Sequence, residues 1–220
     1  MTLTSAPVRS RTRPGPALAV LAALSLLLLT LVAAGWGPLL DFDRWTAEGL
    51  HGPAVDEPDV THANRILTDW VWDPWTMRAL TAVVVGWLLW RGERLVAGIV
   101  VGGTVVGLIV QQGLKAAVGR DRPSWPDPVD SAHYAAFPSG HAMSVAVTLG
   151  IGVWLLRRYG APAGWQRAAW AVAGVSVAGV GFTRVWLGVH WPSDVVGGWL
   201  MGAAVVVAVA FLHERVRGEP

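Results

Sequence analysis

The stretch that decides the fold is Leu95–Val118, LVAGIVVGGTVVGLIVQQGLKAAV, in which Lys115 is the only charged residue. A helix needs about 20 consecutive apolar residues to cross a bilayer, and this run meets that length. A membrane β-strand would alternate polar and apolar residues, and no such alternation occurs here. Because lipid offers the backbone no hydrogen-bond partners, the stretch predicts a membrane-spanning helix.

The rest of the chain has the same character. Of its 220 residues, 53% are hydrophobic and only 15% are charged, against about 25% in soluble domains. The other apolar runs are Ala17–Leu40, Met77–Trp90, Ser139–Leu156, Ala168–Leu187 and Asp194–Leu212. The sequence therefore predicts an all-α polytopic membrane protein with six transmembrane helices in one bundle. This domain should span residues 17–213, between a basic cytoplasmic tail at 1–16 and a second cytoplasmic tail at 214–220.

The first run could instead be interpreted as a signal peptide, because Arg9, Arg11 and Arg13 precede it. The apolar core of a signal peptide is about 7–15 residues long, and this run is longer. We therefore interpret it as an uncleaved membrane helix.

Composition also excludes several kinds of site. The chain has no cysteine, which excludes disulfides, thiolate metal sites and a cysteine nucleophile. The formal net charge of +2 is too small to indicate a nucleic-acid partner. Histidines and carboxylates do not cluster at the spacing of metal ligands, so we expect no metal and no other cofactor. Nothing in the sequence indicates an oligomeric state.

The distribution of charge predicts the orientation in the membrane. With the N-terminus inside, the inner side holds 10 of the 17 basic residues and the outer side holds 12 of the 15 acids. Positive charge collects on the cytoplasmic side, so both termini should be cytoplasmic. The outer segments are then 41–75, 119–138 and 188–193.

Tryptophans should mark the membrane surface. We expect Trp70 and Trp72 to lay part of the first outer segment on it. The tryptophans near the span ends are interpreted as interfacial anchors: Trp36, Trp75, Trp90, Trp165, Trp186 and Trp191.

Basic residues on the predicted outer side depart from the rule that positive charge collects on the cytoplasmic side, and they require an explanation. We interpret Arg120 as a side chain that snorkels to the interface. Lys115, Arg122 and Arg184 should instead face one outer pocket, because ionisable residues at membrane depth are functional by default. Three cations suit a multiply charged anion, and arginine forks match phosphate oxygens.

The segment PSGH, Pro138–His141, should begin the fourth helix. Ser139 can cap that helix, so the backbone N–H groups of Gly140 and His141 would point toward the same anion. Taken alone, a Pro-Ser-Gly sequence is ordinary turn chemistry.

His190 and Asp194 form another candidate pair. The sixth helix should begin at Ser193, with Asp194 in its first turn. A carboxylate four residues after His190 can accept a hydrogen bond from Nδ1 and leave Nε2 free as a nucleophile. A loop histidine packed beside a helix cap explains this pair alone equally well. His141, across the pocket, could give a proton to a leaving alkoxide.

In this order the motifs resemble those of the type-2 phosphatidic acid phosphatase family, the integral-membrane lipid phosphate phosphatases. Lys115 to Pro123 fits the family's motif of a lysine, six residues and Arg-Pro. Pro138–His141 fits the second motif, and Arg184, His190 and Asp194 fit the third. Thr183 stands where the family usually has serine, and it keeps the hydroxyl.

The resemblance implies a role for each matching residue. His190 would be the nucleophile that forms a phosphohistidine, Asp194 would orient it, and His141 would protonate the leaving oxygen. No metal is implied. The phosphate would be bound by Lys115, Arg122, Ser139, Gly140 and Arg184.

The substrate would be a lipid phosphate that enters from the bilayer, at an active site facing the periplasm or cell exterior. For a bacterial source the resemblance favours undecaprenyl pyrophosphate, with phosphatidic acid or phosphatidylglycerol phosphate as alternatives. A lipid phosphotransferase with the same pocket stays open, as does a non-catalytic phospholipid-binding or transport protein. The vanadium haloperoxidases, which the family resemblance links to the same pocket, are soluble and longer. The six predicted spans therefore argue against membership of that group.

Overall fold

The computed structural model describes residues 14–218, and within that range the regular structure is entirely helical, which confirms the all-α class. The predicted basic tail at 1–16 lies almost wholly outside the described residues, and so do residues 219–220. The elements are α1 (Pro14–Ala33), α2 (Gly37–Asp56), α3 (Pro58–Ile66), the π-helical turn η1 (Leu67–Val71), α4 (Pro74–Trp90), α5 (Arg94–Val118), α6 (Gly140–Arg158), α7 (Ala163–Trp186) and α8 (Pro192–Arg217).

Within residues 14–218, five helices are long and apolar enough to cross a membrane: α1, α5, α6, α7 and α8. They cover five of the six predicted runs. The remaining run, Met77–Trp90, forms α4, which has 17 residues and falls just short of that length. The chain is therefore a multi-pass membrane protein.

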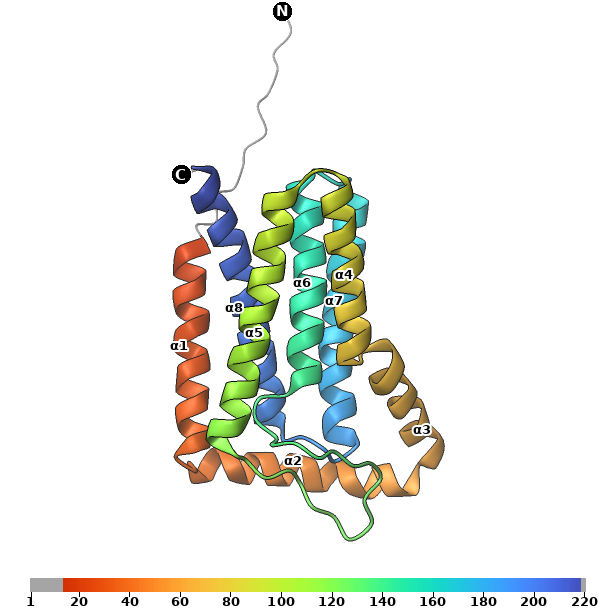
Figure 1. Ribbon diagram of the computed structural model, residues 1–220. Helices are drawn as coiled ribbons and strands as arrows, with labels where there is room; N and C mark the ends of the chain where they lie inside the picture. Colours follow the sequence, from red (N-terminus) through yellow and green to blue (C-terminus); the bar gives the residue numbers. More distant parts are fainter. Residues whose placement is uncertain (1–13, 219–220) are drawn as a thin grey trace, which may run out of the picture.

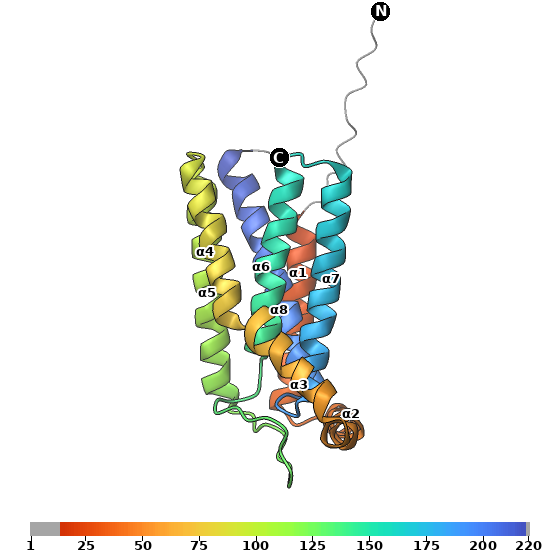
Figure 2. The same ribbon diagram turned by 90° about the vertical axis from the view of Figure 1, so that its right-hand side faces the viewer.

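The helices form one upright bundle. In Figure 1, α1, α4, α5, α6, α7 and α8 stand side by side, and α2 lies across their lower ends. Figure 2, turned by 90°, shows α2 nearly end-on at this same end. The α5–α6 and α7–α8 connections also lie there, whereas the α4–α5 and α6–α7 turns lie at the opposite end. The segments that carry the three motifs thus converge at one end of the bundle.

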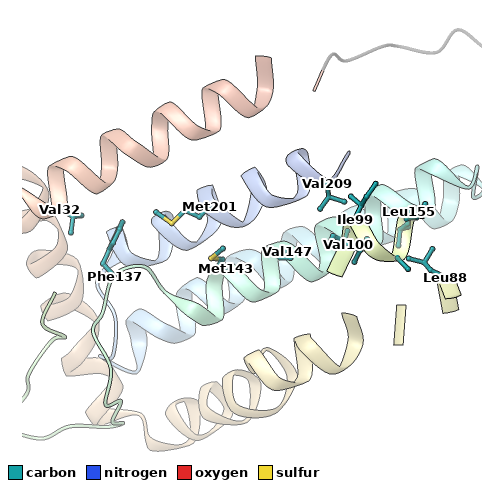
Figure 3. Packing of buried hydrophobic residues seen from close by; sticks show 13 residues of the cluster. Val32, Leu88, Ile99, Val100, Phe137, Met143, Val147, Leu155, Met201 and Val209 are labelled. Atoms are coloured by element: carbon teal, nitrogen blue, oxygen red, sulfur yellow. The ribbon is translucent and has the colours of Figure 1, made fainter. Parts of the chain in front are cut away.

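Helix α8 packs against α6, α1 and α5, and its apolar side chains join the main core. Figure 3 shows Met201 of α8 close to Met143 of α6 within this cluster. Glycine permits the two helices to approach closely, because a Cβ at Gly198 would lie only 2.6 Å from the Ser139 carbonyl oxygen. This contact brings the start of α8 against the start of α6, where the second and third motifs lie.

The run predicted at Ala17–Leu40 is wrong at its C-terminal end. Helix α1 ends at Ala33, and Gly35, with a φ of +67°, turns the chain before α2 begins at Gly37. Pro38 lies in the first turn of α2, where proline costs no hydrogen bond. The final residues of the predicted run therefore belong to a second helix that lies across the bundle.

Helix α2 is amphipathic. Asp43, Ala47 and Ala54 are buried against the bundle, at the spacing of one helix face. Phe42 and Trp45 on the other side are exposed. An acidic residue therefore lies on the inward face, between apolar neighbours.

Two tryptophans are not where the sequence predicts them. Trp72, predicted at the membrane surface, is 8% exposed and packs on Gly179 of α7. Trp186, predicted as an interfacial anchor, is equally buried, and its Nε1 donates a hydrogen bond to Thr61 Oγ1 at 2.9 Å. Both lie where residues 41–75 meet α7, because that segment folds onto the bundle.

Candidate active site

The second motif is built as a helix start. Ser139 is the N-cap of α6, and its Oγ accepts a hydrogen bond from the Ala142 N–H at 3.5 Å. The Ser139 N–H donates to the Asp194 carbonyl oxygen at 2.9 Å, which ties the second motif to the third. A Cβ at Gly140 would lie 2.7 Å from Gln111 Nε2, so the end of the Gln111 side chain packs directly on this glycine.

The third motif holds a buried histidine against a buried carboxylate. His190 Nδ1 lies 3.3 Å from Asp194 Oδ2, and the two residues are 1% and 0% exposed. The same Oδ2 accepts a hydrogen bond from the Trp191 N–H at 2.9 Å. Helix α8 begins at Pro192, one residue before the predicted start, and Asp194 lies in its first turn as predicted.

Contacts on both sides of the ring fix the tautomer of His190. Arg122 Nη1 lies 3.1 Å from His190 Nε2, and a guanidinium can only donate. Nε2 must therefore carry the lone pair, and Nδ1 must carry the proton that faces Asp194. This is the protonation pattern that a histidine nucleophile requires.

Electrostatics keep His190 neutral. Burial lowers its pKa well below the ordinary value of 6.5, and the positive charges of Arg122, Arg184, Lys115 and Arg120 lower it further. Burial also lowers the pKa of the Arg122 guanidinium, and Asp194 and Asp130 oppose that shift. The Nε2 lone pair of His190 thus stays available below the pH at which an exposed histidine would take up a proton.

The predicted phosphate-binding cations lie around this histidine. Arg122 Nε donates to the Tyr134 carbonyl oxygen at 2.5 Å, and Lys115 Nζ donates to the Ala135 carbonyl oxygen. Arg184 is 4% exposed; its Nη1 donates to Thr68 Oγ1 at 3.3 Å, and its Nε has no partner among residues 14–218. An unpartnered guanidinium N–H in a buried position is a donor that an anion site can use.

His141 lies in the first turn of α6. It is within electrostatic range of Arg184, His190, Arg122 and Lys115. The structure therefore gathers every sequence-predicted site residue at one end of the bundle. Their catalytic and binding roles stay predictions.

The interpretation of Arg120 as a snorkelling side chain is wrong. Its side chain is 11% exposed and lies between two carboxylates, with Nη2 at 2.7 Å from Asp43 Oδ2 and Nη1 at 2.6 Å from Asp194 Oδ1. Sequence reasoning also missed Asp43, Ser193 and Thr68. The spacing of Asp43 with Ala47 and Ala54 was the available signal, since it places a charge on a buried helix face.

Within the described range, 14–218, no group of three or more His, Asp or Glu side chains is arranged to hold a metal ion. The positive charges that surround His190 come from guanidinium and ammonium groups.

Comparisons with known proteins agree with this arrangement. The family model of the PAP2 superfamily matches residues 95–217, which include all three motifs. A crystal structure of a transmembrane PAP2-type phosphatidylglycerolphosphate phosphatase from Bacillus subtilis superposes with a TM-score of 0.79, at 20% identity, over 90% of this chain and 96% of that one. That likeness establishes the fold.

Curated relatives are lipid phosphatases. The chain is 30% identical over 110 residues to phosphatidylglycerophosphatase B of Bacillus subtilis (strain 168), covering 50% of this chain and 54% of the relative. It is 29% identical over 147 residues to the undecaprenyl-diphosphatase of Sulfolobus acidocaldarius, covering 61% and 60%. The chain thus matches only about half to three fifths of the length of these relatives.

Proposed function

The chain belongs to the PAP2 superfamily, and from this premise we propose that it is a membrane-bound lipid phosphatase that works through a phosphohistidine on His190. One observation carries the proposal. His190 is fixed between Asp194 and Arg122 in the tautomer that leaves Nε2 unprotonated. A histidine that served only to pack beside a helix cap would not need a guanidinium against its second nitrogen.

In the first step, His190 Nε2 attacks phosphorus and the P–O bond to the lipid breaks. The leaving oxygen takes a proton from His141. Asp194 accepts the Nδ1 hydrogen bond and stabilises the charge that develops on the His190 ring. The products of this step are the lipid alcohol, or the lipid monophosphate if a pyrophosphate is cleaved, and N-phosphorylated His190.

In the second step, water attacks the phosphorus, gives its proton to His141, and the N–P bond breaks. Inorganic phosphate leaves, and both histidines return to their starting states. Throughout, Lys115, Arg122 and Arg184 stabilise the charge on the phosphoryl oxygens, together with N–H groups at the start of α6. These cations supply the positive charge for which other phosphatases use metal ions.

We propose a polyprenyl pyrophosphate, undecaprenyl pyrophosphate, as the substrate. The relative from Sulfolobus acidocaldarius is an undecaprenyl-diphosphatase, and the site lies at the end of an apolar bundle, within reach of a headgroup in the bilayer. Phosphatidylglycerol phosphate is the alternative that the Bacillus subtilis relative supports.

The topology we propose has six crossings over residues 17–213, with α4 as the sixth. A helix of 17 residues is about 25 Å long, close to the lower limit for a span. Arg78 lies 4.7 Å from the Trp75 ring at the end of α4, as expected for an interfacial anchor. Both termini would be cytoplasmic, and the site would face the periplasm or cell exterior.

A panel of lipid phosphates tests the proposed function. Purified protein in detergent should release phosphate from undecaprenyl pyrophosphate faster than from phosphatidylglycerol phosphate or phosphatidic acid. The rate of phosphate release should not change in excess EDTA, because side-chain cations and not a metal ion bind the phosphate. No release from any of these lipids would contradict a phosphatase, and loss of activity in EDTA with recovery in Mg²⁺ would contradict the metal-free mechanism. Transfer of phosphate to an added alcohol in preference to water would indicate a phosphotransferase.

Single cysteines test the sidedness, since the chain has none of its own. Ser131 is exposed near the site, and Gly164 is exposed near the start of α7, at the opposite end of the bundle. A membrane-impermeant maleimide added to intact cells should label Ser131→Cys. It should label Gly164→Cys only after the membrane is opened. The reverse pattern would place the active site on the cytoplasmic side.

A further inference from the structure

We infer that Arg120 and Asp43 are positioning residues that act through Asp194 on the His190 nucleophile; this inference rests on the proposed function. Arg120 is one of the six intervening residues of the first motif, to which the motif assigns no role, and Asp43 lies outside all three motifs. In the structure, both residues form the outer part of one continuous series of charged hydrogen bonds that ends at Nδ1 of the His190 ring, on the side opposite the attacking Nε2.

The Asp194 carboxylate is the member of this hydrogen-bond series that contacts His190, and its two oxygens have different partners. Oδ2 faces His190 Nδ1 and accepts from the Trp191 N–H. Oδ1 accepts from Arg120 Nη1 at 2.6 Å, the shortest of these contacts. With Oδ1 fixed, the carboxylate cannot rotate, and Oδ2 is held toward the imidazole.

Charge gives Arg120 a second task. Asp194 is 0% exposed, and a carboxylate removed from water needs a compensating partner to stay ionised. His190 must be neutral to attack, so it cannot supply that charge before the reaction. Arg120 is the cation in direct contact with Asp194, and it keeps the carboxylate negative until the imidazole becomes positive.

Asp43 holds Arg120 in its place. Its Oδ2 accepts from Arg120 Nη2 at 2.7 Å and from Ser193 Oγ at 2.5 Å, while its Oδ1 accepts from the Ser193 N–H at 2.9 Å. Ser193 Oγ also accepts from Arg120 Nη1 at 2.7 Å. The planar guanidinium thus bridges two carboxylates, a geometry that lysine cannot reproduce. Asp43 is 1% exposed, so this contact is not a solvated surface pair.

An exposed pair on the same helix provides the matched control. Arg44 and Asp41 lie 3.7 Å apart, with side chains 60% and 74% exposed. Such surface pairs contribute little. Arg44→Gln should therefore leave turnover unchanged, although it removes the same charge one residue from Asp43.

The test is a mutant cycle between Arg120 and Asp194, read as kcat and KM for the best lipid of the panel. Arg120→Gln should lower kcat about 10- to 100-fold, the effect of losing one buried charged hydrogen bond, with KM changed less than about threefold. Arg120→Lys should restore part of the loss. In an Asp194→Asn background, Arg120→Gln should lower kcat less than about threefold. The reason is that Arg120 acts through residue 194, which is already neutral in that background.

Two further variants keep the test decisive if Arg120→Gln folds poorly. Asp43→Asn leaves the Arg120–Asp194 contact in place and should lower kcat less than Arg120→Gln does. The double variant Asp43→Asn/Arg120→Gln removes one negative and one positive buried charge together and should recover the folded yield but not kcat. Equal losses from Arg120→Gln in the wild-type and Asp194→Asn backgrounds would overturn the inference, as would a rise in KM at constant kcat.

Vanadate binding, measured by calorimetry, separates this inference from the proposed function. A trigonal bipyramidal vanadate on His190 needs the oriented ring but no lipid. Arg120→Gln should weaken vanadate binding at least about tenfold in the wild-type background and little in Asp194→Asn. That pattern in a protein that hydrolyses none of the lipids would retain the inference and reject the proposed function. A wild-type protein that neither hydrolyses a phosphate ester nor binds vanadate would overturn both.

Discussion

His190→Ala should lower turnover of every lipid phosphate by on the order of 10⁴-fold or more, because loss of a covalent nucleophile removes the reaction path itself. Its Nε2 is the unprotonated nitrogen held beside Arg122, and the arginine guanidinium groups around it cannot attack phosphorus. The measurement is phosphate release under saturating lipid. In parallel, a ³²P-labelled substrate quenched in alkali should leave label on wild-type protein, at His190, and none on the variant.

A matched substitution controls for general damage to the fold. His62 is exposed on α3 and has no part in the proposed reaction, so His62→Ala should keep wild-type turnover and labelling. Residual activity of His190→Ala within tenfold of the wild type would show that another group attacks phosphorus. Label trapped on a residue other than His190 would show the same.

The second large effect should come from His141→Ala, and it should depend on the leaving group. A lipid alkoxide needs a proton as it departs. The variant should therefore hydrolyse a lipid monoester about 10²- to 10⁴-fold more slowly than the wild type. A nitrophenolate leaves readily without one, so the loss on an aryl phosphate should stay below about tenfold. The comparison should use the first turnover, since His141 would also take the proton from water in the second step.

Ser144→Ala is the control for this experiment. Ser144 lies one turn further along α6 and is partly buried like His141, but no role in the reaction is assigned to it. It should leave the first turnover of both substrates unchanged. Equal losses on both substrates in His141→Ala would remove the leaving-group role. The residue would then belong with the cations that bind phosphate.

The sequence predicted what is local. Hydropathy over one helix length identified five helices that meet the spanning length, and α4 at nearly its full extent, because the bilayer imposes that length directly. The Ser139 cap and the His190–Asp194 contact were also predictable, since each joins residues at most four positions apart. The C-terminal limit of the first span could not be predicted, because the apolar character continues past Gly35 into a helix that lies across the bundle.

What the sequence could not give is the long-range part of the site. Arg120 meets Asp43 across 77 positions, and Arg184 meets Thr68 across 116. Hydropathy treats Asp43 as one more acid in a polar outer segment, and it treats Arg120 as one more base near a span end. Only the folding of α2 onto the end of the bundle makes them partners, and that packing depends on surfaces far apart in the sequence.

The position of Asp43 affects how such proteins could recombine with their relatives. Residues 95–217, which match the family, carry every proposed catalytic and phosphate-binding residue, yet the counter-charge of Arg120 and the hydroxyl against Arg184 come from α2 and η1. A chimera that joins this segment to another protein's leading helices would bury Arg120 and Asp194 without the second carboxylate. We therefore expect such a chimera to fold and turn over substrate only when the donated first helices bring their own acid to that point.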